Sequence, residues 1–181
     1  MPISENVRRH ESGHAIAAVA LGIELLTPAM TLLSDLEASV NVAPPTSSSP
    51  DEAWCIRRAA VKLAGPIAMI RSRGQIMDWQ TLREEFEYAT DLNEAERVLQ
   101  KFWLDRGVCP PEHLVSEQLN RAASLAIQCI DQNEARLPPS SKRRSHRTYL
   151  ASSRFSMQLP NISRSTPPTR WNKRSWLAGC I

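Results

Sequence analysis

The 181-residue chain lacks the sequence features that mark several classes of protein. Its four cysteines are widely spread and form no Cys-x-x-Cys pair, which argues against a paired-cysteine zinc site and against a redox disulfide. It contains no Gly-x-x-x-x-Gly-Lys-Ser/Thr loop, so ATP is not an expected partner. The first residues hold no apolar core of secretory-leader length, and the longest apolar run, residues 15–26, is shorter than the ~20 residues of a membrane helix. We therefore expect a cytoplasmic protein without a membrane segment.

Acidic residues are absent from residues 138–181, although this segment contains nine lysines and arginines, nine serines and five prolines. The part before it carries 13 basic and 19 acidic residues, a net charge of −6. This contrast predicts one domain, residues 1–137, followed by a disordered, basic Ser/Pro/Arg-rich tail, residues 138–181. We interpret the tail as a solvated segment, with contact to nucleic acid or an acidic surface through charge as the alternative.

Residue patterns predict a mainly helical domain with a small β-hairpin or sheet. Ser4 can cap a first helix over residues 4–21, which Gly22 can end, and residues 30–33 and 39–42 are compatible with two short strands. Ser49 and Pro50 form a typical start for a second helix, which Pro66 should kink. The expected later helices cover residues 51–72, a region from about 81 to 107, and residues 112–136.

The pattern His-Glu-x-x-His occurs at residues 10–14, inside the first predicted helix. Histidines four residues apart lie on one helix face, where both imidazoles can bind one zinc ion at about 2.0–2.1 Å. His10 and His14 would be the ligands, and Glu11 would act as the general base that activates zinc-bound water. From this chain's own composition, the pattern arises by chance in roughly one chain in a hundred.

A catalytic zinc ion needs a third protein ligand, which leaves the fourth position for water. In the metzincin class, a glycine stands three residues after the second histidine of the motif, and the histidine six residues after that motif histidine is the third ligand. Those positions hold Ala17 and Ala20, so the metzincin class is excluded. The third ligand must therefore come from another part of the chain.

Three stretches, in order, resemble the peptidase domain of the FtsH family of zinc metalloproteases. HESGHAIAAVALG, residues 10–22, is similar to that family's His-Glu-x-Gly-His-Ala motif. VKLAGPIAMI, residues 61–70, resembles its second helix, as found in small stand-alone relatives from phages and bacteria. ATDLNEAERVL, residues 89–99, resembles the segment in which an Asp-Leu-x-x-Ala pattern supplies the third zinc ligand. The resemblance covers about residues 5–136 and implies a zincin-like helical metallopeptidase domain.

Carried over residue by residue, the resemblance makes His10, His14 and Asp91 zinc ligands and Glu11 the catalytic base. Asp91 also forms an Asp-x-x-Glu pattern with Glu94, which is typical of a helix cap, so a purely capping role is an alternative. The chain departs from the family at Met69, where relatives often have an acidic residue. The competing candidates for the third ligand are Glu87, followed by Asp78, Glu84 and Glu85, whereas His113 and His146 have no partner at a useful spacing.

The leading hypothesis is an ATP-independent zinc metalloendopeptidase that hydrolyses peptide bonds in flexible or unfolded polypeptides. The alternative is a zinc-binding or interaction protein of the same fold with little or no activity. A third hypothesis is a nucleic-acid-associated protein in which the basic tail dominates and the histidine motif is accidental.

Overall fold

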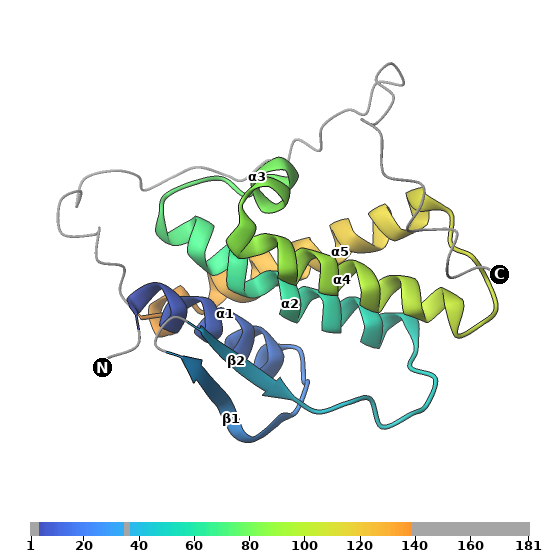
Figure 1. The fold of residues 1–181 in the computed structure, drawn as a ribbon, viewed down its shortest axis with the longest axis horizontal. Helices are drawn as coiled ribbons and strands as arrows, with labels where there is room; N and C mark the ends of the chain where they lie inside the picture. Colours follow the sequence, from blue (N-terminus) through green and yellow to red (C-terminus); the bar gives the residue numbers. More distant parts are fainter. Residues whose placement is uncertain (1–3, 35–36, 139–181) are drawn as a thin grey trace. The chain divides into compact units, whose positions relative to one another are not determined.

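The computed structural model describes residues 4–34 and 37–138, which form helices and one two-stranded antiparallel sheet (Figure 1). This confirms the prediction of a mainly helical chain with a small hairpin. The predicted tail lies, from residue 139 onward, outside the described residues. The elements in order are α1 (Glu5–Ala20), β1 (Leu25–Ser34), β2 (Glu37–Val42), α2 (Glu52–Ser72), α3 (Trp79–Glu84), α4 (Phe86–Leu104), α5 (Glu112–Gln132) and the 3₁₀ turn η1 (Glu134–Arg136).

Helix α2 is the central element, because it packs against α1, α4 and α5 (Figure 1). Its core side chains, such as Leu63, Ile67 and Ile70, are completely buried. Such a helix can be apolar on most of its circumference, since neighbours surround it. The helix continues through Pro66 without ending.

The start of α2 differs from the prediction that Ser49 caps it and Pro50 opens it. Asp51 is the cap, and its carboxylate accepts a hydrogen bond of 2.6 Å from the backbone N–H of Trp54. A carboxylate also interacts favourably with the positive end of the helix dipole. The charged side chain two residues further on therefore takes the capping position from the serine.

Helix α1 approaches α2 very closely, and this approach depends on Gly13. A Cβ atom at this position would lie 2.6 Å from the carbonyl oxygen of Ala64 and 2.9 Å from the Cβ of Ala68. The predicted start of α1 is confirmed, because the Ser4 hydroxyl accepts from the backbone N–H of Val7. Gly22 follows the helix with a φ of 68°, as its predicted role in ending the helix requires. The histidine motif is thus held against the centre of the domain.

The predicted helical region after residue 81 consists of two helices, α3 and α4, which divide at Glu85. Asp91 and Glu94 consequently lie inside α4, more than one turn after its start. The alternative in which Asp91 and Glu94 form a capping box is wrong, because the backbone N–H groups there already bond within the helix. Gly107, with a φ of 69°, follows the end of α4 as expected.

The C-terminal end of the described region is tied to α1. Helix α5 ends earlier than predicted, and the turn η1 leads to the buried side chain of Leu137. The buried guanidinium of Arg9 donates a hydrogen bond from Nη1 to the carbonyl oxygen of Pro138. It donates a second one, of 3.1 Å, from Nε to the carbonyl oxygen of Ala68. Residues up to Pro138 therefore belong to the packed structure.

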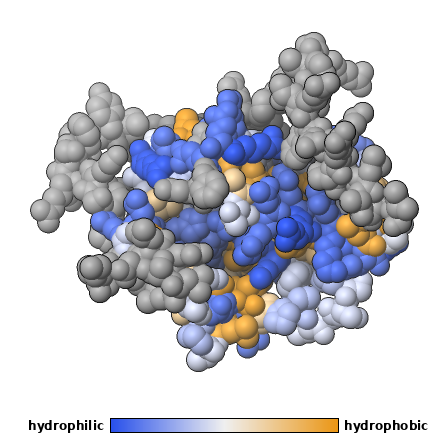
Figure 2. Space-filling model, in the orientation of Figure 1, coloured by the Kyte–Doolittle hydropathy of each residue, from blue (hydrophilic) through white to orange (hydrophobic). Residues whose placement is uncertain are grey.

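Most of the visible surface of the described residues is hydrophilic, with hydrophobic residues gathered in a few patches (Figure 2). Within the described residues, no helix combines the length and the hydrophobicity needed to cross a bilayer.

Candidate metal centre

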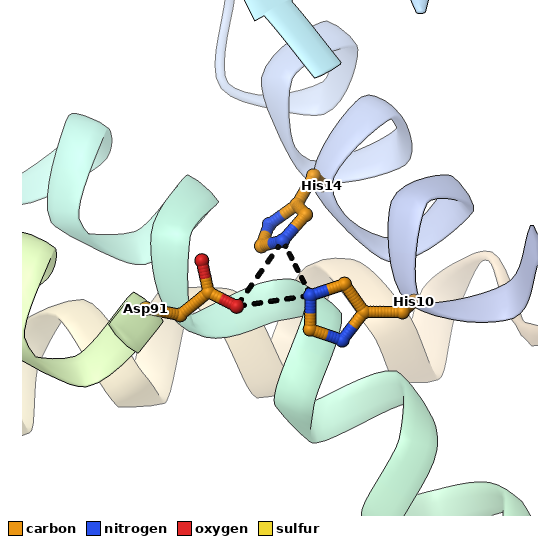
Figure 3. Close-up of side chains that lie close together, drawn as sticks. All are labelled: His10, His14 and Asp91. Carbon is orange, nitrogen blue, oxygen red and sulfur yellow. Dashed lines mark hydrogen bonds and ion pairs between the residues drawn. The ribbon is translucent and has the colours of Figure 1, made fainter. Parts of the chain in front are cut away.

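Three side chains from two helices converge on one point. His10 and His14 project from α1, and Asp91 reaches them from α4 (Figure 3). The Nε2 atoms of the two histidines are 3.0 Å apart. The Oδ2 atom of Asp91 lies 2.9 Å from Nε2 of His10 and 3.5 Å from Nε2 of His14. Segments 77 residues or more apart in the sequence thus contribute to one cluster.

The spacing of these atoms fits a small metal ion. Ligands bound to zinc at 2.0–2.1 Å in a tetrahedral arrangement lie about 3.3 Å from one another. The three distances in the cluster, 2.9, 3.0 and 3.5 Å, fall on either side of this value. Two imidazole nitrogens and one carboxylate oxygen are also a ligand set that zinc accepts. The cluster therefore passes a test of both distance and donor chemistry.

The backbone of α2 determines which nitrogen of His14 faces the cluster. Nδ1 of His14 lies 2.7 Å from the carbonyl oxygen of Val61. Because a carbonyl oxygen can only accept, Nδ1 must carry the hydrogen, and Nε2 of the neutral ring keeps its lone pair for a metal. The ring of His14 is thus oriented by a contact outside the ligand set.

A glycine provides the space in which the two imidazoles meet. A Cβ atom at Gly65, on α2, would lie 2.4 Å from Nε2 of His14 and 2.9 Å from Nε2 of His10. Both distances are shorter than atoms in contact allow. Any side chain at this position would therefore displace the proposed ligand atoms themselves.

The electrostatics of the cluster favour a carboxylate facing positive charge. Burial alone would raise the pKa of Asp91, but hydrogen bonds from the rings of His10 and His14 bring it well below its usual range. Burial would likewise lower the pKa of His14, but the hydrogen bond and charge of Asp91 raise it. Asp91 is therefore ionised at neutral pH and attracts positive charge to this point, whether a proton or a metal ion.

Glu11 lies beside the cluster on α1 and is 5% exposed. Burial raises the pKa of its carboxyl group, while the nearby His14 and His10 and a hydrogen bond from the backbone of Val40 oppose the rise. Val40 belongs to β2, which packs on α1. Within the described part of the chain, Oε2 of Glu11 is buried and has no hydrogen-bond partner. A buried acceptor without a partner is costly to a fold, so Oε2 is available to accept a hydrogen bond or a proton from a group outside the described chain.

The structure places the competing candidate ligands elsewhere. Glu84 accepts a hydrogen bond from Gln80, and Glu85 pairs with Arg73. Among the described residues, His10, His14 and Asp91 are the one group of three or more metal-binding side chains that meet, and Asp78 is not part of it. His113 is exposed at the start of α5, and Met69 is buried in the core. The side chain of Glu87 and all of His146 lie outside the described part of the structure.

Sequence reasoning missed two contributions of α2 to the cluster, the space at Gly65 and the carbonyl of Val61. The signal for Gly65 was present, because a glycine inside a strongly helical segment costs ~1 kcal/mol relative to alanine and calls for a packing reason. The role of Val61 has no sequence signal, since every residue carries the same carbonyl group.

Comparisons of the chain with models of protein families, with curated proteins and with solved structures found no match.

Proposed function

We propose that this protein is an ATP-independent zinc metalloendopeptidase with a zincin-like domain similar to the FtsH peptidase. Its substrates would be flexible or unfolded polypeptides. The observation that carries the proposal is the meeting of His10, His14 and Asp91 beside the buried carboxylate of Glu11. The sequence contains no phosphate-binding loop, so the proposal assigns these residues no ATP-driven unfolding of substrates.

The three converging side chains would hold the metal ion. His10 and His14 would bind through Nε2, and Asp91 through Oδ2, which are the atoms that face one another in the cluster. When bound, a zinc ion would lower the pKa of a bound water molecule to about 7 and would polarise the carbonyl group of the scissile bond. Val61 and Gly65 would act as positioning residues, because they orient the ring of His14 and leave room for it.

Glu11 would move the proton. Its Oε2 atom has no partner among the described residues and so can accept a proton from the attacking water. Burial raises the pKa of this carboxyl group, so it is a stronger base than an exposed glutamate. The protonated carboxyl group would then return the proton to the leaving amine. The contact with the backbone of Val40 holds the carboxylate in place. One residue would therefore serve as base and then as acid.

The test is to replace Glu11 by glutamine and to measure zinc content and cleavage of an unstructured protein such as casein. We expect about one zinc ion per chain in both proteins, and cleavage reduced by about 10² to 10⁴-fold in Glu11→Gln, because only the proton carrier is lost. Glu5→Gln is the matched control, since Glu5 is an exposed glutamate on the same helix, and it should keep both zinc and activity.

Each other outcome contradicts part of the proposal. Stoichiometric zinc without cleavage that depends on Glu11 would leave a zinc-binding or interaction protein of the same fold. A protein that binds no stoichiometric metal would refute both alternatives. Full zinc affinity after Asp91→Ala would remove Asp91 from the ligand set.

A further inference from the structure

Arg58 lies on the same face of α2 as the residues that contact the candidate metal centre. It precedes Gly65 by seven residues, which is nearly two helical turns, and Val61 by three. Gly65 faces the imidazoles, and the carbonyl of Val61 faces the ring of His14. The rise of an α-helix places Arg58 about 10 Å along the axis from Gly65. An extended peptide covers this length with about three residues.

The guanidinium of Arg58 lacks the partner that a half-buried cation normally has. Its Nη1 atom is buried and has no hydrogen-bond partner in the described part of the chain. Glu94, one turn beyond Asp91 on α4, is the charged group that acts on Arg58, but its carboxylate is paired with the amine of Lys62. Glu94 is thus paired with Lys62, and within the described part of the chain Arg58 has no ion pair of its own.

This arrangement suits a guanidinium that receives an anion from outside the chain. Burial lowers the pKa of Arg58, and the charge of Glu94 only partly opposes this. The guanidinium nevertheless remains charged at neutral pH, because the ordinary pKa of arginine lies far above neutrality. Part of its hydration has already been lost in folding, so an arriving carboxylate gains more from it than from a fully hydrated arginine. Arginine also offers parallel N–H donors that match the two oxygens of a carboxylate.

We propose that Arg58 binds a carboxylate group of the polypeptide substrate, about three residues from the bond that is cut. The carboxylate can come from an Asp or Glu side chain or from the C-terminus of the substrate. The proposal rests on the peptidase function proposed above and adds a preference to it: among flexible polypeptides, those with a negative charge at this distance are favoured.

The binding test uses the full-length, zinc-loaded Glu11→Gln protein, so that no peptide is cut. Fluorescence anisotropy is measured with labelled, unstructured peptides of Gly, Ser, Ala and Leu that differ by one Glu or Gln, each with a free or an amidated C-terminus. We expect a peptide that carries the recognised carboxylate to bind at least about tenfold more tightly than the matching peptide without it. Comparison of the Glu and Gln peptides, and of the free and amidated C-termini, shows which carboxylate is recognised.

The matched variants are Arg58→Gln and Arg57→Gln. Arg57 is the adjacent, exposed arginine, about 100° away around the helix, so its replacement removes the same charge from another face. We expect Arg58→Gln to abolish the preference for the carboxylate peptide, Arg57→Gln to keep it, and Arg58→Lys to restore part of it. Zinc content and the unfolding midpoint confirm that each variant is intact.

The outcomes for the two proposals are distinguishable. In the protein with Arg58, equal affinity for the Glu and Gln peptides together with equal affinity for the free and amidated C-termini overturns this inference without any mutation at that position. A preference that survives Arg58→Gln overturns it as well. Cleavage that depends on Glu11 but shows neither an acidic residue nor a C-terminal carboxylate enriched about three positions from the cut refutes the role of Arg58 alone. A preference in binding without Glu11-dependent cleavage refutes the peptidase and leaves a carboxylate-binding site.

Discussion

Replacement of Gly65 by alanine should separate metal binding from folding. The added Cβ would lie 2.4 Å from Nε2 of His14, whereas ordinary contact begins at 3.4 Å, so the ring has to move by about 1 Å. Metal sites tolerate displacements of about 0.2 Å. Loss of an orienting contact alone typically lowers metal affinity by about 10 to 100-fold. We therefore expect Gly65→Ala to weaken zinc binding by at least about 100-fold.

The same change should leave the metal-free fold almost as stable as before. Moving His14 off its rotamer costs about 0.5–1.5 kcal/mol, and losing its hydrogen bond to Val61 costs about 1 kcal/mol. Against this, alanine in place of glycine inside a helix gains about 1 kcal/mol. The free energy of unfolding without metal should therefore change by less than about 2 kcal/mol.

The assay combines urea unfolding of the metal-free protein with zinc competition against a chromogenic chelator. Ala53→Gly is the control, because it makes the reverse exchange at an exposed position of α2 and should lower stability slightly without affecting zinc. Wild-type zinc affinity in Gly65→Ala would show that the ion does not bind where the two imidazoles meet. A large loss of metal-free stability would show that Gly65 serves packing and not the site.

Two further predictions concern pH and the core. The pKa of His14 is raised in the folded state, so its protonated form stabilises the metal-free fold below a pH of about 6.5, and this contribution is lost as pH rises through the folded pKa. Urea unfolding should therefore show metal-free stability falling as pH rises above about 6.5, while zinc affinity rises. Asp91→Asn should flatten this fall in stability, and a flat profile in the wild type would contradict the pairing of His14 with Asp91. Arg9→Met should lower the free energy of unfolding by about 2–3 kcal/mol, because it removes the hydrogen bonds from the buried guanidinium to the carbonyl oxygens of Ala68 and Pro138. An unchanged midpoint of urea unfolding would refute this role of Arg9.

Much of the local structure could be predicted because the responsible residues are neighbours in the sequence. Ser4 and Gly22 delimit α1, and the predicted strand stretches 30–33 and 39–42 lie within β1 and β2, although β1 begins five residues earlier than predicted, at Leu25. The cap of α2 was predicted wrongly because Ser49 and Asp51 are both good caps, and the choice between them depends on how the preceding loop runs. The division at Glu85 was missed for a similar reason, since no glycine or proline marks it.

The sequence indicated which side chains could form the cluster, but it did not indicate how the neighbouring helix packs around them. Residue types and spacing indicated His10 and His14, the resemblance to the FtsH family implied Asp91, and the structure brings the three side chains together. The space at Gly65 and the half-buried state of Arg58 depend on how α2 packs against α1 and α4, which no short pattern encodes. The role of the three side chains as zinc ligands stays a prediction.

The division of the cluster between α1 and α4 has a consequence for the order of events during synthesis. His10 and Glu11 leave the ribosome about 80 residues before Asp91, and Gly65 also precedes it. Under the proposed function, a nascent chain would carry the complete histidine motif for some time without a third ligand, and the ion would not be held until α4 packs on α2. Proteolytic competence would arise late, as a property of the assembled helices, so the growing chain would not cut its own unfolded segments.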